Sequence, residues 1–139
     1  GPVEKILKAY PNEVRVVYKN FPLRNHKQAN LAALYSLASG KQGKYIEMHK
    51  NIMNRFGELK KNQHLLLELA SELGLNIDQL KADVKNPELQ KQINTEVSEL
   101  RSTGLRLAVP KFLINGEEIQ LRALQKRIDE ILSNSNGIN

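Results

Sequence analysis

The sequence predicts an α/β fold, because strand-forming stretches lie near both ends of the chain and helical patterns fill the residues between them. Near the C-terminus, Phe112-Leu113-Ile114 is an apolar run of strand length, and Asn115-Gly116 readily accepts the positive φ values of a type I′ turn. Near the N-terminus, residues 14–21 largely alternate between apolar and polar side chains. Between residues 25 and 103, apolar side chains recur at helical spacing.

The first element is predicted to be a helix from Pro2 to Tyr10, since proline suits the first helical position. Its apolar side chains fall at positions i, i+3, i+4 and i+7, which are Val3, Ile6, Leu7 and Tyr10. The next element is predicted to be a strand from Val14 to Phe21, which Pro22 closes. This predicted strand therefore lies between a single helix and a run of helices.

Five helices are predicted in the central region. The first runs from Ala29 to Ser39 and ends at Gly40, and the last begins at Asn86-Pro87, a cap followed by proline, and ends near Gly104. The second helix has an apolar face of Tyr45, Met48, Ile52 and Phe56, and the third, which stops at Gly74, has one of Leu65, Leu66, Leu69 and Leu73. The short fourth helix carries Ile77, Leu80 and Val84, and the fifth carries Leu89, Ile93, Val97 and Leu100.

The chain is predicted to end in a hairpin and one helix. Pro110 lacks a backbone N–H and suits the first position of a strand, and the second strand returns over Glu117 to Leu121. The last helix is predicted over Ala123 to Leu132, with Leu124, Ile128, Ile131 and Leu132 facing inward. Residues 133–139 are expected to form a frayed tail.

Composition favours one globular domain and excludes several classes of protein. A chain of 139 residues with 40% hydrophobic content suits a single core, and no apolar run approaches the roughly 18 residues of a membrane span. The net charge is +6, but basic and acidic residues are interleaved and no nucleic-acid recognition motif is present. We therefore predict no nucleic-acid partner and no membrane span.

Candidate chemistry is sparse in this sequence. The three histidines, His26, His49 and His64, do not have the spacing of metal ligands, so we predict structural or surface roles for them and no metal or cofactor. Glu117 and Glu118 are adjacent on a predicted strand and should face opposite ways, which disfavours a paired-carboxylate site. The chain contains no cysteine.

Two segments carry a resemblance to a known family. Val109-Pro110-Lys111-Phe112-Leu113-Ile114-Asn115-Gly116, followed by a short strand and an amphipathic helix, resembles the C-terminal half of a thioredoxin fold, and valine before the proline resembles its DsbA branch. Residues 14–23, His26, the alanine-rich run 29–38 and residues 45–49 resemble the strand and helical insertion of DsbA-like thiol:disulfide oxidoreductases. The resemblance implies a single thioredoxin-like α/β domain over residues 1–139, with 25–103 as a large helical insertion within it.

The resemblance defines two function classes. DsbA-like enzymes work through a Cys-x-x-Cys pair at the start of their first helix, where the helix N-terminus favours the thiolate. Without cysteine this chain cannot cycle between dithiol and disulfide, so no residue is assigned as catalytic. We expect the first strand and the redox motif of the family upstream of Gly1, which would make the chain an N-terminally truncated, redox-inactive body of such an oxidoreductase. The alternative is a non-catalytic thioredoxin-like module that binds peptides or proteins.

The resemblance also implies partners and a location. In thioredoxin-like proteins the residue before the cis-proline offers its backbone to an extended substrate peptide, so Val109 and Pro110 are the candidate substrate-binding residues. The alternative is that Val109 only shapes the loop. The implied partners are cysteine-containing or extended polypeptide substrates, and the implied location is the cell envelope or periplasm.

The first strand of the family lies between the strands matched by residues 14–21 and 111–114. Without it, both neighbours have unpaired backbone groups on their inner edges, which cost about 1–3 kcal/mol each when buried. We therefore expect one of two outcomes. Another segment fills the gap, as in a homo-oligomer formed by strand exchange, or the two strands shift and pair directly.

Overall fold

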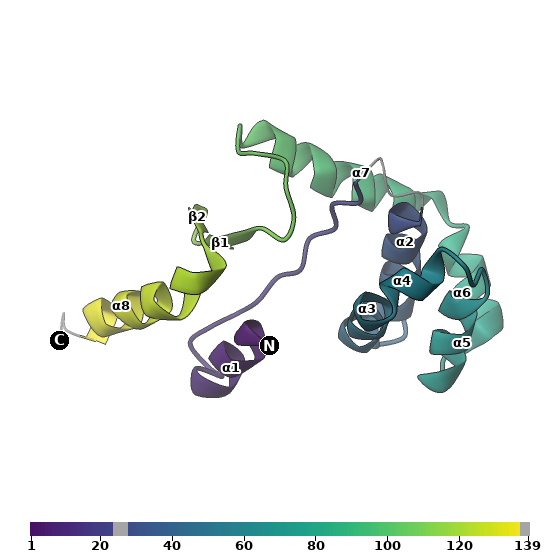
Figure 1. Ribbon diagram of the computed structural model, residues 1–139, viewed down its shortest axis with the longest axis horizontal. Helices are drawn as coiled ribbons and strands as arrows, with labels where there is room; N and C mark the ends of the chain where they lie inside the picture. The colour runs from purple at the N-terminus through teal and green to yellow at the C-terminus, as the bar shows by residue number, and fades with distance from the viewer. Residues whose placement is uncertain (24–27, 137–139) are drawn as a thin grey trace. The chain divides into compact units, whose positions relative to one another are not determined.

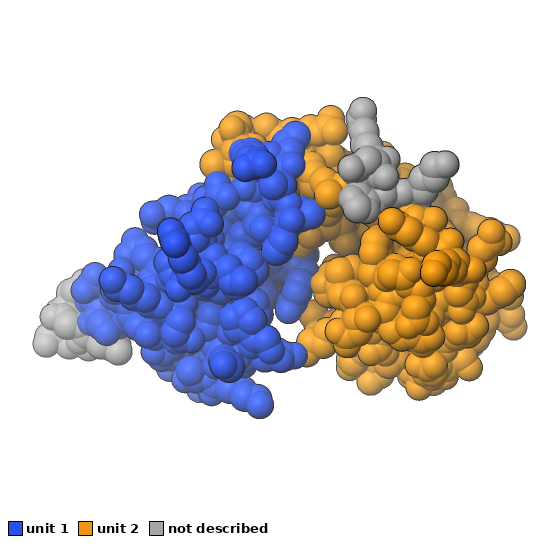
Figure 2. Space-filling view, viewed as in Figure 1, with its two compact units in different colours: residues 1–18, 106–139 blue, residues 19–105 orange. Residues whose placement is uncertain are grey.

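The computed structural model describes residues 1–23 and 28–136, and the chain divides into two compact units. Unit 1 comprises Gly1–Tyr18 and Arg106–Asn139, and unit 2 comprises Lys19–Leu105 (Figure 2). In chain order, unit 2 lies between the two segments of unit 1. That residues 25–103 form a helical insertion within a single domain stays a prediction.

The described residues of unit 1 form two α-helices, a hairpin and a short 3₁₀ helix. In chain order these are α1 (Pro2–Ala9), β1 (Phe112–Ile114), β2 (Glu117–Ile119), η1 (Leu121–Ala123) and α8 (Leu124–Asn136) (Figure 1). Its core contains the buried side chains of Ile6, Leu124 and Ile128, with half-buried residues of α1, the hairpin and α8 packed against them. The α1 prediction is therefore confirmed, including the inward position of Ile6.

The hairpin forms as predicted, with one difference at its end. β1 and β2 are antiparallel, with Phe112 opposite Ile119, and Asn115 and Gly116 have φ values of +50° and +85°, as a type I′ turn requires. The second strand was predicted to reach Leu121, but β2 ends at Ile119. The register would place Leu121 opposite Pro110, which has no N–H to donate, so the ladder stops before that pair.

The predicted strand from Val14 to Phe21 is wrong, because residues 14–23 form no strand. Side chains still alternate between half-buried and exposed from Val14 to Lys19, as in an extended chain. A strand also needs a hydrogen-bonded neighbour, and among the described residues β1 pairs with β2 alone. Direct pairing of this segment with β1, the second of the two expected outcomes, is therefore wrong as well.

The predicted frayed tail also begins too early. α8 continues through Asn136, so residues 133–136 are helical, and residues 137–139 lie outside the described part of the chain. The preceding turns of α8 are anchored by Leu124 and Ile128 in the core, and each further residue then adds one hydrogen bond at little cost. Propagation from this anchored helix accounts for the extra turn.

In the described part of unit 2, all secondary-structure elements are helices, and residues 19–23 belong to no element. Its helices are α2 (Ala29–Gly40), α3 (Tyr45–Asn54), α4 (Phe56–Leu59), α5 (Leu65–Glu72), α6 (Ile77–Val84) and α7 (Pro87–Ser102). α2 packs against α3, α5, α6 and α7, around a core that includes Met48, Ile52, Leu65, Leu66, Leu69 and Leu80. The apolar faces predicted over α5 and α6, together with Met48 and Ile52 of α3 and Leu89 of α7, thus belong to one core.

The ends of these helices follow the predicted signals in most places. The side chain of Asn86 accepts a hydrogen bond from the backbone N–H of Glu88, with Pro87 at the first helical position, and Gly74 and Gly104 take the positive φ that ends a helix. The second predicted helix is the exception, because it breaks at Arg55, and Phe56 begins α4 instead. The break lies at Arg55 itself, whose backbone is not helical, with φ −119° and ψ 18°.

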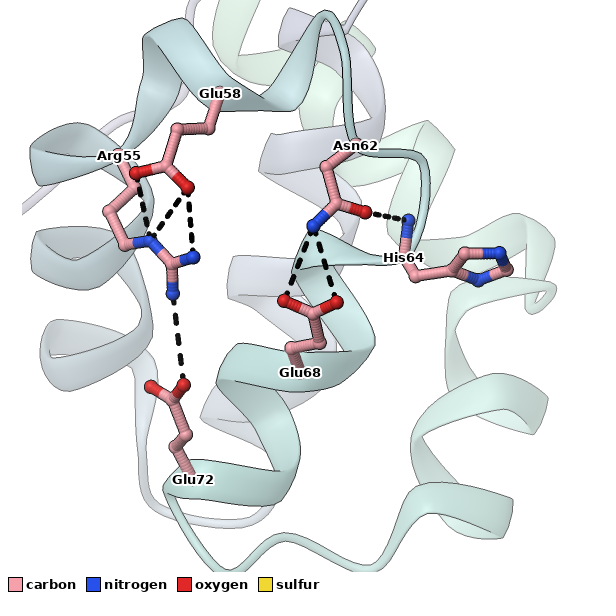
Figure 3. A network of polar contacts seen from close by, with 6 residues as sticks. All are labelled: Arg55, Glu58, Asn62, His64, Glu68 and Glu72. Carbon is pink, nitrogen blue, oxygen red and sulfur yellow. Dashed lines mark hydrogen bonds and ion pairs between the residues drawn. The ribbon is translucent and has the colours of Figure 1, made fainter.

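A polar network joins α4 to α5 (Figure 3). The Arg55 guanidinium donates to Glu58 at 2.9 Å and lies 3.7 Å from a carboxylate oxygen of Glu72. The Asn62 side chain donates to Glu68 and accepts a hydrogen bond from the backbone N–H of His64 at 2.9 Å, just before α5 begins. Hydrogen bonds from Arg55 lower the pKa of the Glu58 carboxyl. These contacts hold the turn between the two helices.

One buried carboxylate fixes the start of unit 2. Glu96 of α7 is 8% exposed and accepts hydrogen bonds from the backbone N–H of Asn20 at 2.5 Å and from its side-chain amide at 2.9 Å. Gln92 donates a third at 3.2 Å. This carboxylate therefore takes the place of a strand partner for the backbone at Asn20.

Candidate peptide-binding site

The loop before β1 carries the two residues predicted to bind substrate. Val109 is 45% exposed, Pro110 is exposed, and the peptide bond between them is cis. Among the described residues, no backbone hydrogen bond engages Val109, so its N–H and C=O are accessible to a ligand. The substrate-binding role of Val109 and Pro110 stays a prediction.

A groove begins one residue beyond this loop. It has a volume of about 270 Å³ within unit 1, and its lining includes residues 13–17 and residues 111–115, called here its two walls. α1 and α8 contribute its apolar lining, called here its floor, which consists of Val3, Ile6, Leu124, Ile128, Ile131 and Leu132. The lining therefore comes from two backbone segments and two helices.

Three charged residues belong to the groove walls. The Lys111 side chain is 7% exposed, and its Nζ lies 2.6 Å from Oε1 of Glu118 on β2. Glu13 and Arg15 belong to the opposite wall, and both residues are exposed. Because Glu118 offsets the charge of Lys111, the middle of the groove presents mainly apolar side chains and peptide groups. This suits binding of a polypeptide more than acid–base or nucleophilic chemistry.

A long-range hydrogen bond ties together the two helices of the floor. The Tyr10 hydroxyl, just after α1, donates to Oδ1 of Asp129 on α8 at 2.5 Å, and the Gln125 side chain donates to the same oxygen at 2.9 Å. These hydrogen bonds lower the pKa of the Asp129 carboxyl, and the bond to Asp129, followed by burial, raises the pKa of the Tyr10 hydroxyl. The contact sets the position of α1 relative to α8.

The histidines lie away from this groove. The His49 ring stacks on the Tyr45 ring with centroids 5.9 Å apart, and burial lowers the pKa of its imidazole. His64 is exposed, and His26 lies outside the described residues. Within residues 1–23 and 28–136, no three His, Cys, Asp or Glu side chains are placed to hold a metal ion.

Some of the segments singled out in the sequence line the groove, and others do not. Residues 13–17 and residues 111–115 both line one groove. Val109 and Pro110 do not line that groove, and Lys111 is the residue that joins loop and wall. The floor was missed as a site, although the inward-facing residues of the first and last predicted helices could have indicated it. Nothing in the sequence indicates the Tyr10–Asp129 contact.

Comparison of the sequence with models of known protein families gives a match. The model of a family described as Thioredoxin matches residues 2–134, nearly the whole chain. A search of curated proteins and a search of solved structures both return no match. In the described part of the chain, no helix combines the length and apolar character that crossing a membrane requires.

Proposed function

Since the chain belongs to the thioredoxin family, we propose that it is the body of a DsbA-like thiol:disulfide oxidoreductase that acts on the cysteines of other proteins. The observation that carries this proposal is the exposed loop at Val109 and Pro110, directly before the hairpin, with the backbone of Val109 open to a ligand. The valine before the proline and the helical region 25–103 are the features that favour the DsbA branch within the family. Its substrates would be cysteine-containing or extended polypeptides in the cell envelope.

In this proposal, residues 1–139 hold the substrate and do not carry the redox cysteines, because they contain no cysteine. Disulfide exchange requires a thiolate that attacks a disulfide sulfur, and residues 1–139 contain no sulfur of that kind. The redox pair would therefore come from residues outside this range. The role of this chain is to hold the substrate, through hydrogen bonds from the Val109 backbone to an extended segment beside the reacting cysteine.

The test is to read the codons that precede Gly1 in the parent gene and to assay the encoded polypeptide for reduction of insulin disulfides. A short apolar strand followed by Cys-x-x-Cys, together with activity, would support the proposal. In that polypeptide, Val109→Pro should slow turnover of protein disulfides more than turnover of a small disulfide, because only the former uses the backbone N–H at this position. A parent polypeptide without cysteine would refute the catalytic proposal.

The second candidate is a non-catalytic module that binds polypeptides. The groove in unit 1 favours it, because the groove offers apolar surface and backbone groups within a chain that has no cysteine. The two candidates differ in one measurable respect. Binding by such a module would be the same for peptides with and without cysteine, and thiol-blocking reagents would leave it unchanged.

A further inference from the structure

We infer that the loop at Val109 and Pro110 selects polypeptide segments in which acidic residues flank an apolar centre, and that Arg106 and Arg122 make this selection. The selection rests on the proposed function, since it concerns the class of substrate that the same loop would hold. It requires no cysteine in either partner, so it can be tested apart from disulfide exchange.

The hairpin brings a second segment to the end where this loop lies. Phe112 of β1 lies opposite Ile119 of β2, and Pro110 precedes β1 by one residue. Leu121 and Arg122 follow β2 at the same end of the hairpin. The residues just after β2 are therefore neighbours of the loop in space, although they come later in the chain.

The chain also folds back just before the loop. The backbone N–H of Ala108 donates to the carbonyl of Arg106 at 3.0 Å, which makes a tight turn with Leu107 at its centre. Arg106 is three residues before Val109, so their Cα atoms lie within about 11 Å of each other. The two segments together form a surface called here the loop patch, which consists of Arg106, Leu107, Val109, Leu121 and Arg122.

The loop patch exposes three large apolar side chains. Leu107 and Val109 are each 45% exposed, and Leu121 is 48% exposed. Single exposed apolar residues are common on protein surfaces, but these three belong to two segments that meet at one end of the hairpin. A polypeptide with apolar side chains would cover them while it pairs with the open backbone of Val109.

The charges around the loop are unevenly partnered. Glu118 lies 2.6 Å from Nζ of Lys111, and Glu117 lies 3.5 Å from the guanidinium of Arg127, so both acids of the hairpin are engaged. Both arginines of the loop patch are exposed, and within residues 1–23 and 28–136 no ion pair is formed by either of them. The loop patch therefore presents two positive charges whose field the nearby carboxylates do not offset.

These two guanidinium groups determine which flanking residues a bound segment should have. A guanidinium matches the planar geometry of a carboxylate and can donate two parallel hydrogen bonds to it. Arg106 and Arg122 come from different segments of the loop patch, so each can meet a carboxylate on its own side of the apolar centre. Lysine at the same positions of the substrate would face like charge, which lowers affinity.

An anionic membrane surface also offers apolar and acidic groups, but it fits less well. The backbone N–H and C=O of Val109 take part in no backbone hydrogen bond among the described residues. Lipid tails would leave these groups without partners at a considerable cost, whereas an extended polypeptide supplies both a donor and an acceptor. The open backbone therefore favours a polypeptide.

The experiment titrates three peptides of seven residues into ¹⁵N-labelled residues 1–139 and follows amide shifts by NMR. The peptides share a central Val-Ser-Val and have two glutamates, two glutamines or two lysines on each side of it. We expect the glutamate peptide to bind about fivefold or more tighter than the lysine peptide in 20 mM salt, with the largest shifts in the loop patch. In 1 M salt the screening length falls to about 3 Å, so the difference should fall below about twofold.

Variants connect the preference to the two arginines. Arg106→Gln and Arg122→Gln should each weaken binding of the glutamate peptide about two- to fivefold, and the amide spectrum should otherwise stay unchanged because both side chains are exposed. Lys91→Gln on α7 of unit 2 removes one positive charge from another exposed position, so it is the matched control and should bind as the parent chain does. The double variant Arg106→Glu with Arg122→Glu should prefer the lysine peptide, a reversal that a merely structural role would not produce.

Several outcomes would overturn this selection. These are equal affinity for the glutamate and lysine peptides, equal effects of Arg122→Gln and Lys91→Gln, saturable shifts confined to residues outside the loop patch, and no saturable shifts with any peptide. Binding to phosphatidylglycerol vesicles without binding to the peptides would assign the loop patch to a membrane surface instead. A parent polypeptide without cysteine would refute the redox proposal and leave these results unchanged, so the two failures can be told apart.

Discussion

The carboxylate of Glu96 is the clearest place to test how the start of unit 2 is held. It is 8% exposed and accepts hydrogen bonds from the backbone N–H and the side-chain amide of Asn20, at 2.5 and 2.9 Å. Asn20 is itself only 9% exposed, so water has little access to replace this acceptor. Glu96→Ala therefore leaves a buried backbone N–H without a partner.

The magnitude follows from the number and kind of bonds lost. Hydrogen bonds to a charged group contribute about 1.5–3 kcal/mol each, and an unsatisfied buried donor costs about 1–3 kcal/mol. Because both bonds to Asn20 share one carboxylate oxygen, the contributions are not additive, and we expect a loss of about 2–4 kcal/mol for Glu96→Ala. Glu96→Gln keeps one acceptor oxygen and should lose about 1 kcal/mol.

The assay is urea denaturation followed by circular dichroism, with Glu99→Ala as the matched control. Glu99 lies on the same helix and pairs with Lys19 at 3.2 Å, but both side chains are more than half exposed. Such an exposed pair contributes about 1 kcal/mol or less, and the change in helix propensity is the same for both variants. Equal losses for Glu96→Ala and Glu99→Ala would refute the reasoning, since burial is what separates them.

Three further predictions concern the hairpin, the core of unit 2 and the half-buried imidazole of His49. Gly116→Ala should destabilise the protein by about 1–2 kcal/mol in urea denaturation, because its φ of +85° is strained for any residue with a Cβ; an unchanged midpoint would contradict this. Leu80 is fully buried, so Leu80→Ala should lower the free energy of unfolding by about 2–5 kcal/mol. Leu31 is 42% exposed, so the control Leu31→Ala should lower it by less than about 1 kcal/mol. Similar losses for the two variants would contradict the described core. Burial lowers the pKa of His49 below its ordinary value of 6.5, so its contribution to stability should be complete above pH 6.5 and decrease as pH falls through the lowered folded pKa. His49→Gln should remove that part of the pH dependence, which denaturation at pH 7.5 and pH 5 would measure.

The features that were predictable from sequence are those encoded locally. Asn115-Gly116 specifies the turn by its own φ preferences, and Asn86-Pro87 specifies the start of α7 by its cap and ring, so both could be identified without knowing the rest of the fold. Helical periodicity identified the buried faces in the same way, because residues three and four apart share a side of the helix.

The predictions that were wrong depended on a distant partner. Alternation over residues 14–21 indicates extended backbone, but a strand exists only when a neighbour pairs with it, and that pairing cannot be read from the segment itself. The end of β2 depends on the register that places Leu121 opposite Pro110. The Tyr10–Asp129 contact joins residues 119 positions apart and has no local signal. The Val109–Pro110 loop was singled out by its motif and its substrate-binding role stays a prediction, whereas the groove was not predicted as a site.

The hairpin bears directly on how the loop at Val109 and Pro110 is presented to a substrate. Pro110 is followed at once by Lys111, whose side chain is held by Glu118 of β2. The next residue, Phe112, begins β1 and lies opposite Ile119 of β2. Val109 is therefore presented from an anchored edge, which lowers the entropy cost of aligning a substrate with it.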